Sequence, residues 1–330
     1  MSNSKQAQDS EIDCLHHVGH IVQDIDEGVA LYRRLGFLPT APNYYVLASE
    51  GAAGQAIGPV NAYSTMTQNF IEIVSVAKPG AAPRTGEPQV INVPPEQREV
   101  FAARLAQAGD TIDVWRRQFE GLHILALRTK SADETARRLT AAGVSNTGAS
   151  TVNRKMETEQ GPRNVPIRFL EVGAPGEDVR SVIPEGRIAI AENPDVEVLH
   201  AQKNTGQPNG ALHLAEAFLY VDDADIDSVA KRYAGYLGRT PRMTEVGRVF
   251  DLGDARVTLL TRKGLRDILG AEQAAGSPAF AGYAVDVSDL EATRTLLTDN
   301  GFPIAETPAG HVLVPSAAAL GANILFRAVR

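Results

Sequence analysis

One glutamate and two histidines lie inside apolar runs of the sequence, where burial of a titratable side chain is unfavourable unless it has a partner. Glu72 stands between Ile71 and Ile73, and a carboxylate inside an apolar strand needs a partner. The partner would be an arginine or a metal ion, and the metal is the favoured interpretation. His17 and His123 each stand in an apolar run as well. A lone histidine in such a run is more often packed than a ligand, so its wider context must decide.

Other familiar catalytic patterns do not occur in the sequence. The glycine-rich stretch 51–58 is not followed by a Lys-Ser or Lys-Thr pair, so it predicts a loop between strands and no phosphate cradle. No Gly-x-Ser-x-Gly pattern supports a hydrolase triad. Cys14 is the single cysteine, which excludes an intrachain disulfide and a thiolate-rich metal site. An inert small residue is the favoured interpretation of Cys14.

The segments that position these residues repeat four times along the chain. Each repeat begins as an apolar strand, passes an acidic or hydroxyl-bearing cap, and continues as a helix that closes at a glycine. The spacing from strand landmark to closing glycine is similar in all four: 17–36, 123–143, 216–238 and 282–301. Short β-rich runs follow each helix, so each repeat predicts a strand, a helix and about three further strands.

Local patterns support the predicted helices. Ser131 with Glu134, and Ser288 with Glu291, have the spacing of capping boxes, in which side chains satisfy amide groups at a helix start. A further helix is predicted over Pro95–Ala108, between the first two repeats.

The four repeats predict an α+β fold of four tandem βαβββ modules, which form two paired-module domains with curved mixed sheets. A disordered N-terminus is expected over 1–11 and an N-terminal domain over 12–172. A connector rich in Pro, Gly and charge follows over 173–210, and a C-terminal domain over 211–330.

This arrangement resembles the two-domain, four-module members of the vicinal oxygen chelate superfamily, which is related to glyoxalases, bleomycin-resistance proteins and extradiol dioxygenases. The first module is especially similar, with its Leu15-His16-His17-Val18 opening and its Leu35-Gly36-Phe37 close. Its Phe70-Ile71-Glu72-Ile73-Val74 run is similar to the family's fourth strand, which carries a glutamate. The resemblance covers residues 12 to 330 and is strongest over 15–76 and 119–144.

The resemblance implies one divalent metal held by His17, Glu72 and His123. Two imidazoles and one carboxylate leave open positions for a substrate or oxygen, and they suit Zn, Ni, Fe and Mn alike. His16 and His20 are expected to face away from His17, because neighbouring residues of a strand alternate.

A fourth ligand place is expected on the last strand of the second module, Val165 to Val172. Alternation allows either Glu171 or Arg168, but not both, to point into the cavity. An inward Glu171, which is the favoured alternative, would be a further ligand. An inward Arg168 would bind an anionic or carbonyl-bearing substrate.

The second half departs from this pattern. Glu216 and Gly282 stand where the first half has its two histidines, and the corresponding fourth strands carry no carboxylate. A second metal site is therefore not expected. The second half is instead expected to be a scaffold, a lid or a subunit-contact domain.

The composition of the chain limits the kinds of partner that it can bind. The net charge is −8 and the Lys and Arg residues are scattered, which argues against nucleic acid. No apolar run is long enough to span a membrane, and the first residues lack a secretion signal, so a cytoplasmic location is expected. The expected partner is a small-molecule substrate, and a homodimer is a reasonable assembly for such domains.

Three functions remain open from the sequence. The first is a metal-dependent isomerase or lyase of glyoxalase type, acting on a small carbonyl or hydroxy compound. The second is an Fe(II)-dependent ring-cleaving dioxygenase. The third is a metal-free protein that binds a small molecule and confers resistance by sequestering it.

Overall fold

A computed structural model of the chain describes residues 11–47, 56–78, 84–91, 94–173, 183–271 and 274–329. Nearly all of the predicted disordered N-terminus and most of the glycine-rich stretch 51–58 lie outside these ranges. In the described residues, no helix is both long enough and apolar enough to cross a membrane.

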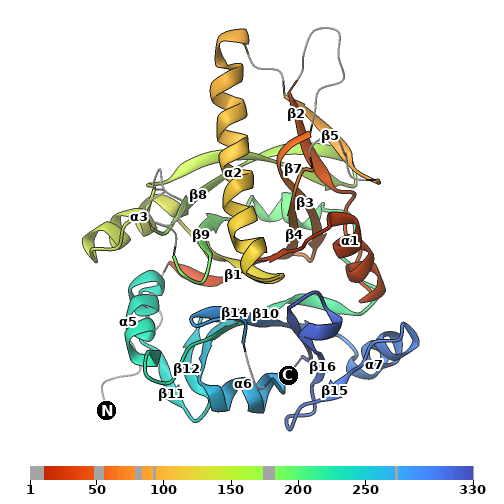
Figure 1. Ribbon diagram of the computed structural model, residues 1–330, viewed down its shortest axis with the longest axis vertical. Helices are drawn as coiled ribbons and strands as arrows, with labels where there is room; N and C mark the ends of the chain where they lie inside the picture. Colours follow the sequence, from red (N-terminus) through yellow and green to blue (C-terminus); the bar gives the residue numbers. More distant parts are fainter. Residues whose placement is uncertain are drawn as a thin grey trace.

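The first half of the chain builds one curved sheet with helices around it (Figure 1). Its elements are β1 (Ile12–Ile21), α1 (Ile25–Arg34), β2 (Asn43–Leu47), β3 (Ala56–Thr65), β4 (Phe70–Val76), β5 (Glu87–Ile91), α2 (Arg98–Gln118), β6 (Gly121–Thr129), α3 (Ala132–Ala141), β7 (Ser150–Thr158), β8 (Gly161–Glu171), β9 (Arg187–Glu192) and α4 (Val196–His200).

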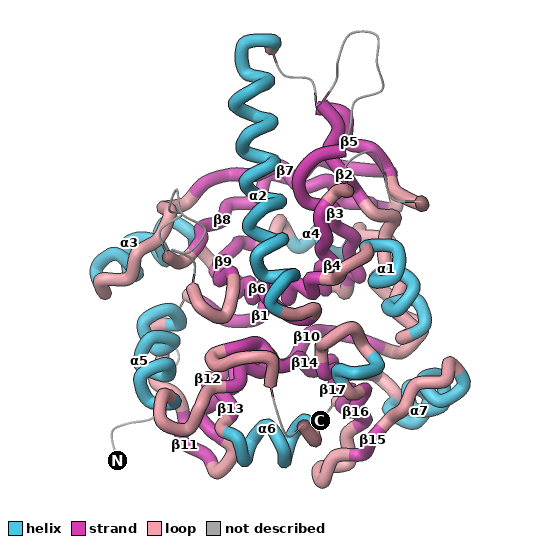
Figure 2. The backbone as a smooth tube through the Cα atoms, viewed as in Figure 1, coloured by secondary structure: helices cyan, strands magenta, loops and turns pink. Residues whose placement is uncertain are grey.

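The second half builds a similar sheet below the first in the view of Figure 2. Its elements are β10 (Ala211–Tyr220), α5 (Ile226–Leu237), β11 (Arg242–Thr244), β12 (Gly247–Asp251), β13 (Arg256–Leu260), α6 (Arg262–Leu269), β14 (Ala279–Val287), α7 (Leu290–Asp299), β15 (Ala305–Glu306), β16 (Val312–Val314) and β17 (Asn323–Ala328).

The strand pairing shows four modules. In each module the first strand runs parallel to the last, as β1 with β4, β6 with β9, β10 with β13 and β14 with β17. Two modules join edge to edge through antiparallel β1 and β6, and the other two through β10 and β14. In the described chain the sheet orders are β5-β2-β3-β4-β1-β6-β9-β8-β7 and β11-β12-β13-β10-β14-β17-β16-β15. The predicted α+β fold of paired modules is confirmed.

Helix caps follow the sequence closely but not everywhere. Ser131 accepts a hydrogen bond from the backbone N–H of Glu134 and begins α3, as predicted. At α7 the capping residue is Asp289, which accepts from the N–H of Ala292. The predicted capping box at Ser288 is therefore wrong, because α7 begins one residue later and a carboxylate caps it.

The segment 173–210, expected to be a connector, contains a strand of the first sheet. Residues 187–192 form β9, which lies between β6 and β8 and pairs parallel with β6. The apolar side chains of Ile188 and Ile190 explain why β9 lies inside the sheet, because both are buried in the core.

The helix predicted over Pro95–Ala108 is longer in the structure and covers part of the inner face of the first sheet. After a short 3-10 turn, α2 runs to Gln118. It packs closely against β3, where a Cβ at Gly109 would lie 3.2 Å from the Cα of Gly58. At its C-terminal end, Ile112 and Trp115 pack against Ile124 and its neighbours.

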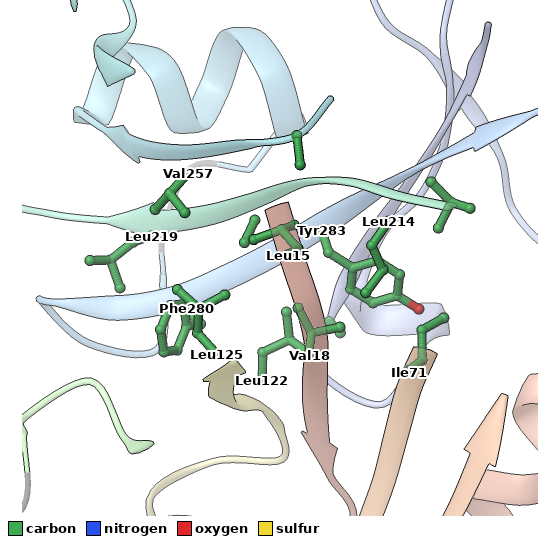
Figure 3. Close-up of a cluster of buried hydrophobic side chains, with 14 of the residues drawn as sticks. Leu15, Val18, Ile71, Leu122, Leu125, Leu214, Leu219, Val257, Phe280 and Tyr283 are labelled. Atoms are coloured by element: carbon green, nitrogen blue, oxygen red, sulfur yellow. The ribbon is translucent and has the colours of Figure 1, made fainter. Parts of the chain in front are cut away.

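The outer faces of the two sheets pack against each other and share one core (Figure 3). Leu15 and Leu125 come from the first sheet, and Leu219 and Phe280 from the second. His20 is buried in this contact, where its Nδ1 lies 2.9 Å from the Tyr32 hydroxyl and its Nε2 donates to the Leu320 carbonyl over 2.7 Å. Burial of this core fixes the halves against each other.

The inner faces of the two sheets differ. In the second half, α6 occupies the concave side, where Leu265 and Leu269 pack against Phe218 and Tyr220 of β10. In the first half, α2 covers only part of the concave side, and a cavity remains there. The difference explains why the candidate site belongs to the first half.

Candidate active site

A cavity of about 990 Å³ lies on the inner face of the first sheet, beside α2. Part of its wall is apolar and comes from both modules: Phe70, Val74, Ile112, Trp115, Ile124, Ile167 and Phe169. Its polar lining includes His16, His17, Asn61, Tyr63, Glu72, Arg154, Glu171 and Arg187. A large apolar pocket with a few converging polar groups is typical of a site for a small organic molecule.

A β-bulge in β1 turns two consecutive histidines towards this cavity. The register of β1 against β6 shifts between Leu15 and His17, which leaves His16 without a pairing partner on β6. Nδ1 of His16 lies 2.7 Å from Nδ1 of His17, so one of these nitrogens donates and the other accepts. The prediction that His16 faces away from His17 is wrong, because the bulge interrupts the alternation.

Both rings are held in the neutral form. Burial, reinforced by the positive charge of Arg154, lowers the pKa of His16 to about 3. Burial also lowers the pKa of His17 well below its usual range. The pair therefore shares a single hydrogen bond between two neutral imidazoles.

Glu72 faces His17 across the cavity floor. Its Oε2 lies 3.7 Å from Nε2 of His17, and its Oε1 accepts a hydrogen bond of 3.2 Å from Nδ2 of Asn61. Burial raises the pKa of Glu72, although the positive charge of Arg187 acts in the opposite direction. A carboxyl with a raised pKa next to a neutral imidazole is the arrangement expected of a group that takes and returns protons.

His123 lies apart from this pair. Its Nε2 donates a hydrogen bond of 3.0 Å to the Phe119 carbonyl, just beyond the C-terminal end of α2. Its ring lies against Phe119, with centroids 4.0 Å apart, and is nearly parallel to Trp115 at 6.3 Å. Burial lowers its pKa to about 4. His123 thus holds the end of α2 against β6.

The three residues expected to hold a metal therefore do not converge. The structure brings His17 and Glu72 together and leaves His123 against α2. Among the described residues, no group of three or more His, Cys, Asp and Glu side chains is placed to hold a metal ion. Arg154 and Arg187 line the same cavity and add positive charge there. These donors do not fit a divalent cation, which needs at least three protein ligands in sites of this kind.

The strand that carries Glu171 and Arg168 is the third of its module, because β9 takes the fourth place. Glu171 lines the cavity, where its carboxylate pairs with Arg187 at 2.5 Å. Arg168 lies on the opposite side of β8 and pairs with Asp133 of α3 at 2.6 Å. The alternation places these two residues apart as expected, but Glu171 already has an arginine as its partner.

Arg154 was not found by the sequence reasoning. It projects from β7 into the cavity, with its guanidinium carbon 3.9 Å from the centre of the Phe70 ring and 5.5 Å from that of Tyr63. In the described residues, no ion pair links it to a carboxylate. Its charge reaches the titratable groups nearby, since it helps lower the pKa of both His16 and His17.

The sequence contains a signal for His16 but none for the two arginines. In a regular strand, two adjacent histidines face opposite sides. The His16-His17 doublet is therefore a signal, because both can face the cavity only if the strand is irregular there. Arg154 and Arg187 lie in ordinary strand segments, and only the curvature of the sheet brings them to the cavity.

The sequence of residues 15–237 matches the family described as the glyoxalase-like domain. The chain belongs to this family, within the vicinal oxygen chelate superfamily. Comparison with curated proteins finds no match.

Solved structures share the fold of this glyoxalase-like protein across nearly its whole length. A hypothetical protein from Staphylococcus aureus has a TM-score of 0.57 at 10% identity, covering 96% of this chain and 100% of its own. A variant of 4-hydroxymandelate synthase from Streptomyces coelicolor has a TM-score of 0.53 at 10% identity, covering 96% and 93%. The 2,3-dioxygenase LapB from Pseudomonas sp. KL28 has a TM-score of 0.50 at 11% identity, covering 97% and 93%. At this identity the likeness concerns the fold alone.

Proposed function

We propose that this glyoxalase-like protein is an enzyme, an isomerase or lyase that moves a proton on a small carbonyl or hydroxy compound. The observation that carries the proposal is the Glu72–His17 pair, a buried carboxyl 3.7 Å from a neutral imidazole on the wall of a cavity of about 990 Å³. Family membership supports the reaction class.

In the proposed reaction, Glu72 in its ionised form takes a proton from the carbon next to the substrate's carbonyl. The electron pair of the C–H bond forms a C=C bond, and the π pair of the carbonyl moves to its oxygen, which gives an enediolate. The proton of the α-hydroxyl moves to that oxygen. Glu72 then returns its proton to the former carbonyl carbon, and the C=O bond forms again at the carbon that carried the hydroxyl. The negative charge that develops on oxygen lies in a cavity lined by the guanidinium of Arg154, whose positive charge stabilises it. The apolar residues of the wall strengthen that interaction, because they lower the local dielectric constant.

The metal that the resemblance implies has no complete set of ligands here, so the proposed steps use only protein groups. The second candidate, a ring-cleaving dioxygenase, is supported by the fold shared with the 2,3-dioxygenase LapB. The third candidate, a binding protein without catalysis, is supported by the pairing of Glu171 with Arg187 and of His123 with a backbone carbonyl.

The test is proton exchange in D2O. The full-length protein is incubated with a panel of α-hydroxy ketones and α-hydroxy aldehydes, and loss of the α-proton signal is followed by proton NMR. We expect exchange with the wild type and a loss of at least about a hundredfold in Glu72→Gln, the scale of general acid–base catalysis. Glu157→Gln is the matched control, because this exposed residue of β7 lies at the cavity rim.

Equal exchange in wild type and Glu72→Gln would contradict the proposal. Catalysis that instead requires dioxygen and added iron would favour the dioxygenase. Binding of panel compounds with no exchange would favour the binding protein.

A further inference from the structure

The cavity contains two hydrogen-bonding groups that the described residues leave without a counterpart. One is the guanidinium of Arg154, which stacks on Phe70 but forms no ion pair with a carboxylate of the described chain. The other is Nε2 of His16, a buried ring nitrogen with no hydrogen-bond partner in the described residues. His16 is only 4% exposed, so water does not readily replace the missing partner.

These two groups suit the same kind of ligand. A guanidinium stacked on an aromatic ring keeps its N–H edge free, and that edge binds carboxylates. The neutral ring of His16 has one N–H, because a neutral imidazole carries a proton on one nitrogen. Both side chains lie against the same ring: the guanidinium carbon of Arg154 is 3.9 Å from the centre of Phe70, and the His16 ring is 5.3 Å from it. This shared neighbour allows both groups to donate to one carboxylate.

The other arginine of the cavity floor is already neutralised. Arg187 pairs with Glu171 at 2.5 Å, whereas no described carboxylate pairs with Arg154. Arg104 and Lys203 also line the cavity, but both are exposed. The surrounding wall is apolar, with Phe70, Trp115 and Phe169 facing the space. The complementary molecule therefore has one negative charge on an apolar body.

We propose that Arg154 and His16 form a subsite for the carboxylate of an organic acid with an aromatic-sized apolar body. This inference rests on the proposed function, because it names the class of substrate that the proposed enzyme would bind in the same cavity. Arg154 and His16 are binding residues, whereas Glu72 moves the proton.

Binding at this subsite also orients the proton-transfer pair. A carboxylate only accepts hydrogen bonds, so His16 must carry its proton on Nε2 when the acid is bound. Its Nδ1 then accepts from Nδ1–H of His17 across 2.7 Å. Nε2 of His17 is left as an acceptor that faces Oε2 of Glu72 at 3.7 Å. The bound acid thereby selects the His17 tautomer that can accept a hydrogen bond from protonated Glu72.

The test uses benzoate and benzamide as probes, since they share a body and differ in charge. Binding to the full-length protein is measured by isothermal titration calorimetry near neutral pH. We expect benzoate to bind the wild type more tightly than benzamide. Arg154→Gln should weaken benzoate binding by about tenfold or more and leave benzamide binding nearly unchanged, because a charge-assisted hydrogen bond is lost.

Two further variants make the result specific. Arg104→Gln removes the same charge from an exposed arginine of α2 at the cavity wall and should leave benzoate binding unchanged. Arg154→Lys keeps the charge without the planar N–H edge and should fall between wild type and Arg154→Gln. It also provides a folded variant should Arg154→Gln fail to fold.

Equal binding of the two probes to the wild type, no binding of benzoate, or equal losses in Arg154→Gln and Arg104→Gln would each overturn the subsite. Glu72→Gln separates this inference from the proposed reaction. Benzoate binding to both the wild type and Glu72→Gln, together with no proton exchange in the wild type, would retain the subsite and reject the reaction.

Discussion

The Nδ1 atoms of His16 and His17 lie 2.7 Å apart, although strand alternation would place these neighbouring side chains on opposite faces. The bulge in β1 makes this contact possible, and it brings His16 to the wall that also carries Glu72 and Arg154. The chemistry of the cavity is therefore built on a local irregularity of one strand.

Replacing Glu72 should affect stability as well as activity. The pKa of Glu72 is raised in the folded protein by burial, so ionisation of this group opposes folding. The cost is absent below the unfolded pKa, near 4.5, and develops as the pH rises above it. Glu72→Gln should therefore be more stable than wild type at neutral pH and similar at about pH 4. Thermal unfolding across this range checks the prediction, and a variant less stable than wild type at neutral pH would contradict it.

Protonation of His20 should lower the free energy of unfolding as the pH falls. Burial lowers its pKa to about 4, while the unfolded chain titrates near 6.5, so its contribution is complete above pH 6.5 and is lost as the pH falls towards 4. In this window one buried histidine accounts for up to about 1.4 kcal/mol per pH unit.

Urea unfolding at stepped pH values measures that slope. His20→Gln should reduce it by about one proton, although the variant is less stable overall because buried hydrogen bonds change. His200→Gln, at an exposed position of α4, is the control and should keep the wild-type slope. The same slope in both variants would reject the assignment.

His123 should behave as a structural residue of α2. His123→Ala removes the hydrogen bond to Phe119 and the contact with its ring, and should lower the free energy of unfolding by about 2–4 kcal/mol. Hydrogen exchange should become faster at the C-terminal end of α2. Added zinc should bind His123→Ala as tightly as it binds wild type. Zinc affinity that falls on removal of either His123 or His17 would instead restore the metal triad.

The packing of α6 against the second sheet should be important for stability. Leu265 is 1% exposed in the cluster that fills the concave side. Leu265→Ala should lower the free energy of unfolding by about 2–5 kcal/mol, because it leaves a cavity in an apolar core. Met243→Ala, at a side chain 77% exposed, should change it by less than about 0.5 kcal/mol. Chemical denaturation of both variants provides the comparison.

Much of the fold follows from local patterns in the sequence. The spacing of strand, cap, helix and closing glycine over 17–36 and its three counterparts predicts the modules, because each rests on interactions within a few residues. Ser131 as a cap is predicted for the same reason. Glu72 is recognisable as a special residue from its apolar neighbours alone.

Tertiary structure decides the rest, because it depends on partners distant in the sequence. Two register shifts between β1 and β6 decide where these histidines lie. One turns His16 inwards, and the other, between Gly19 and His20, leaves His123 without a pairing partner on β1. Both depend on strands more than 100 positions apart in the sequence. The place of β9 depends on a parallel partner, and the filling of the second sheet depends on the packing of α6. The sequence by itself thus determined the four modules and the half that carries titratable residues in apolar strands. Only the folded chain decided which of those residues meet, because a one-residue shift in strand register moves a side chain to the opposite face.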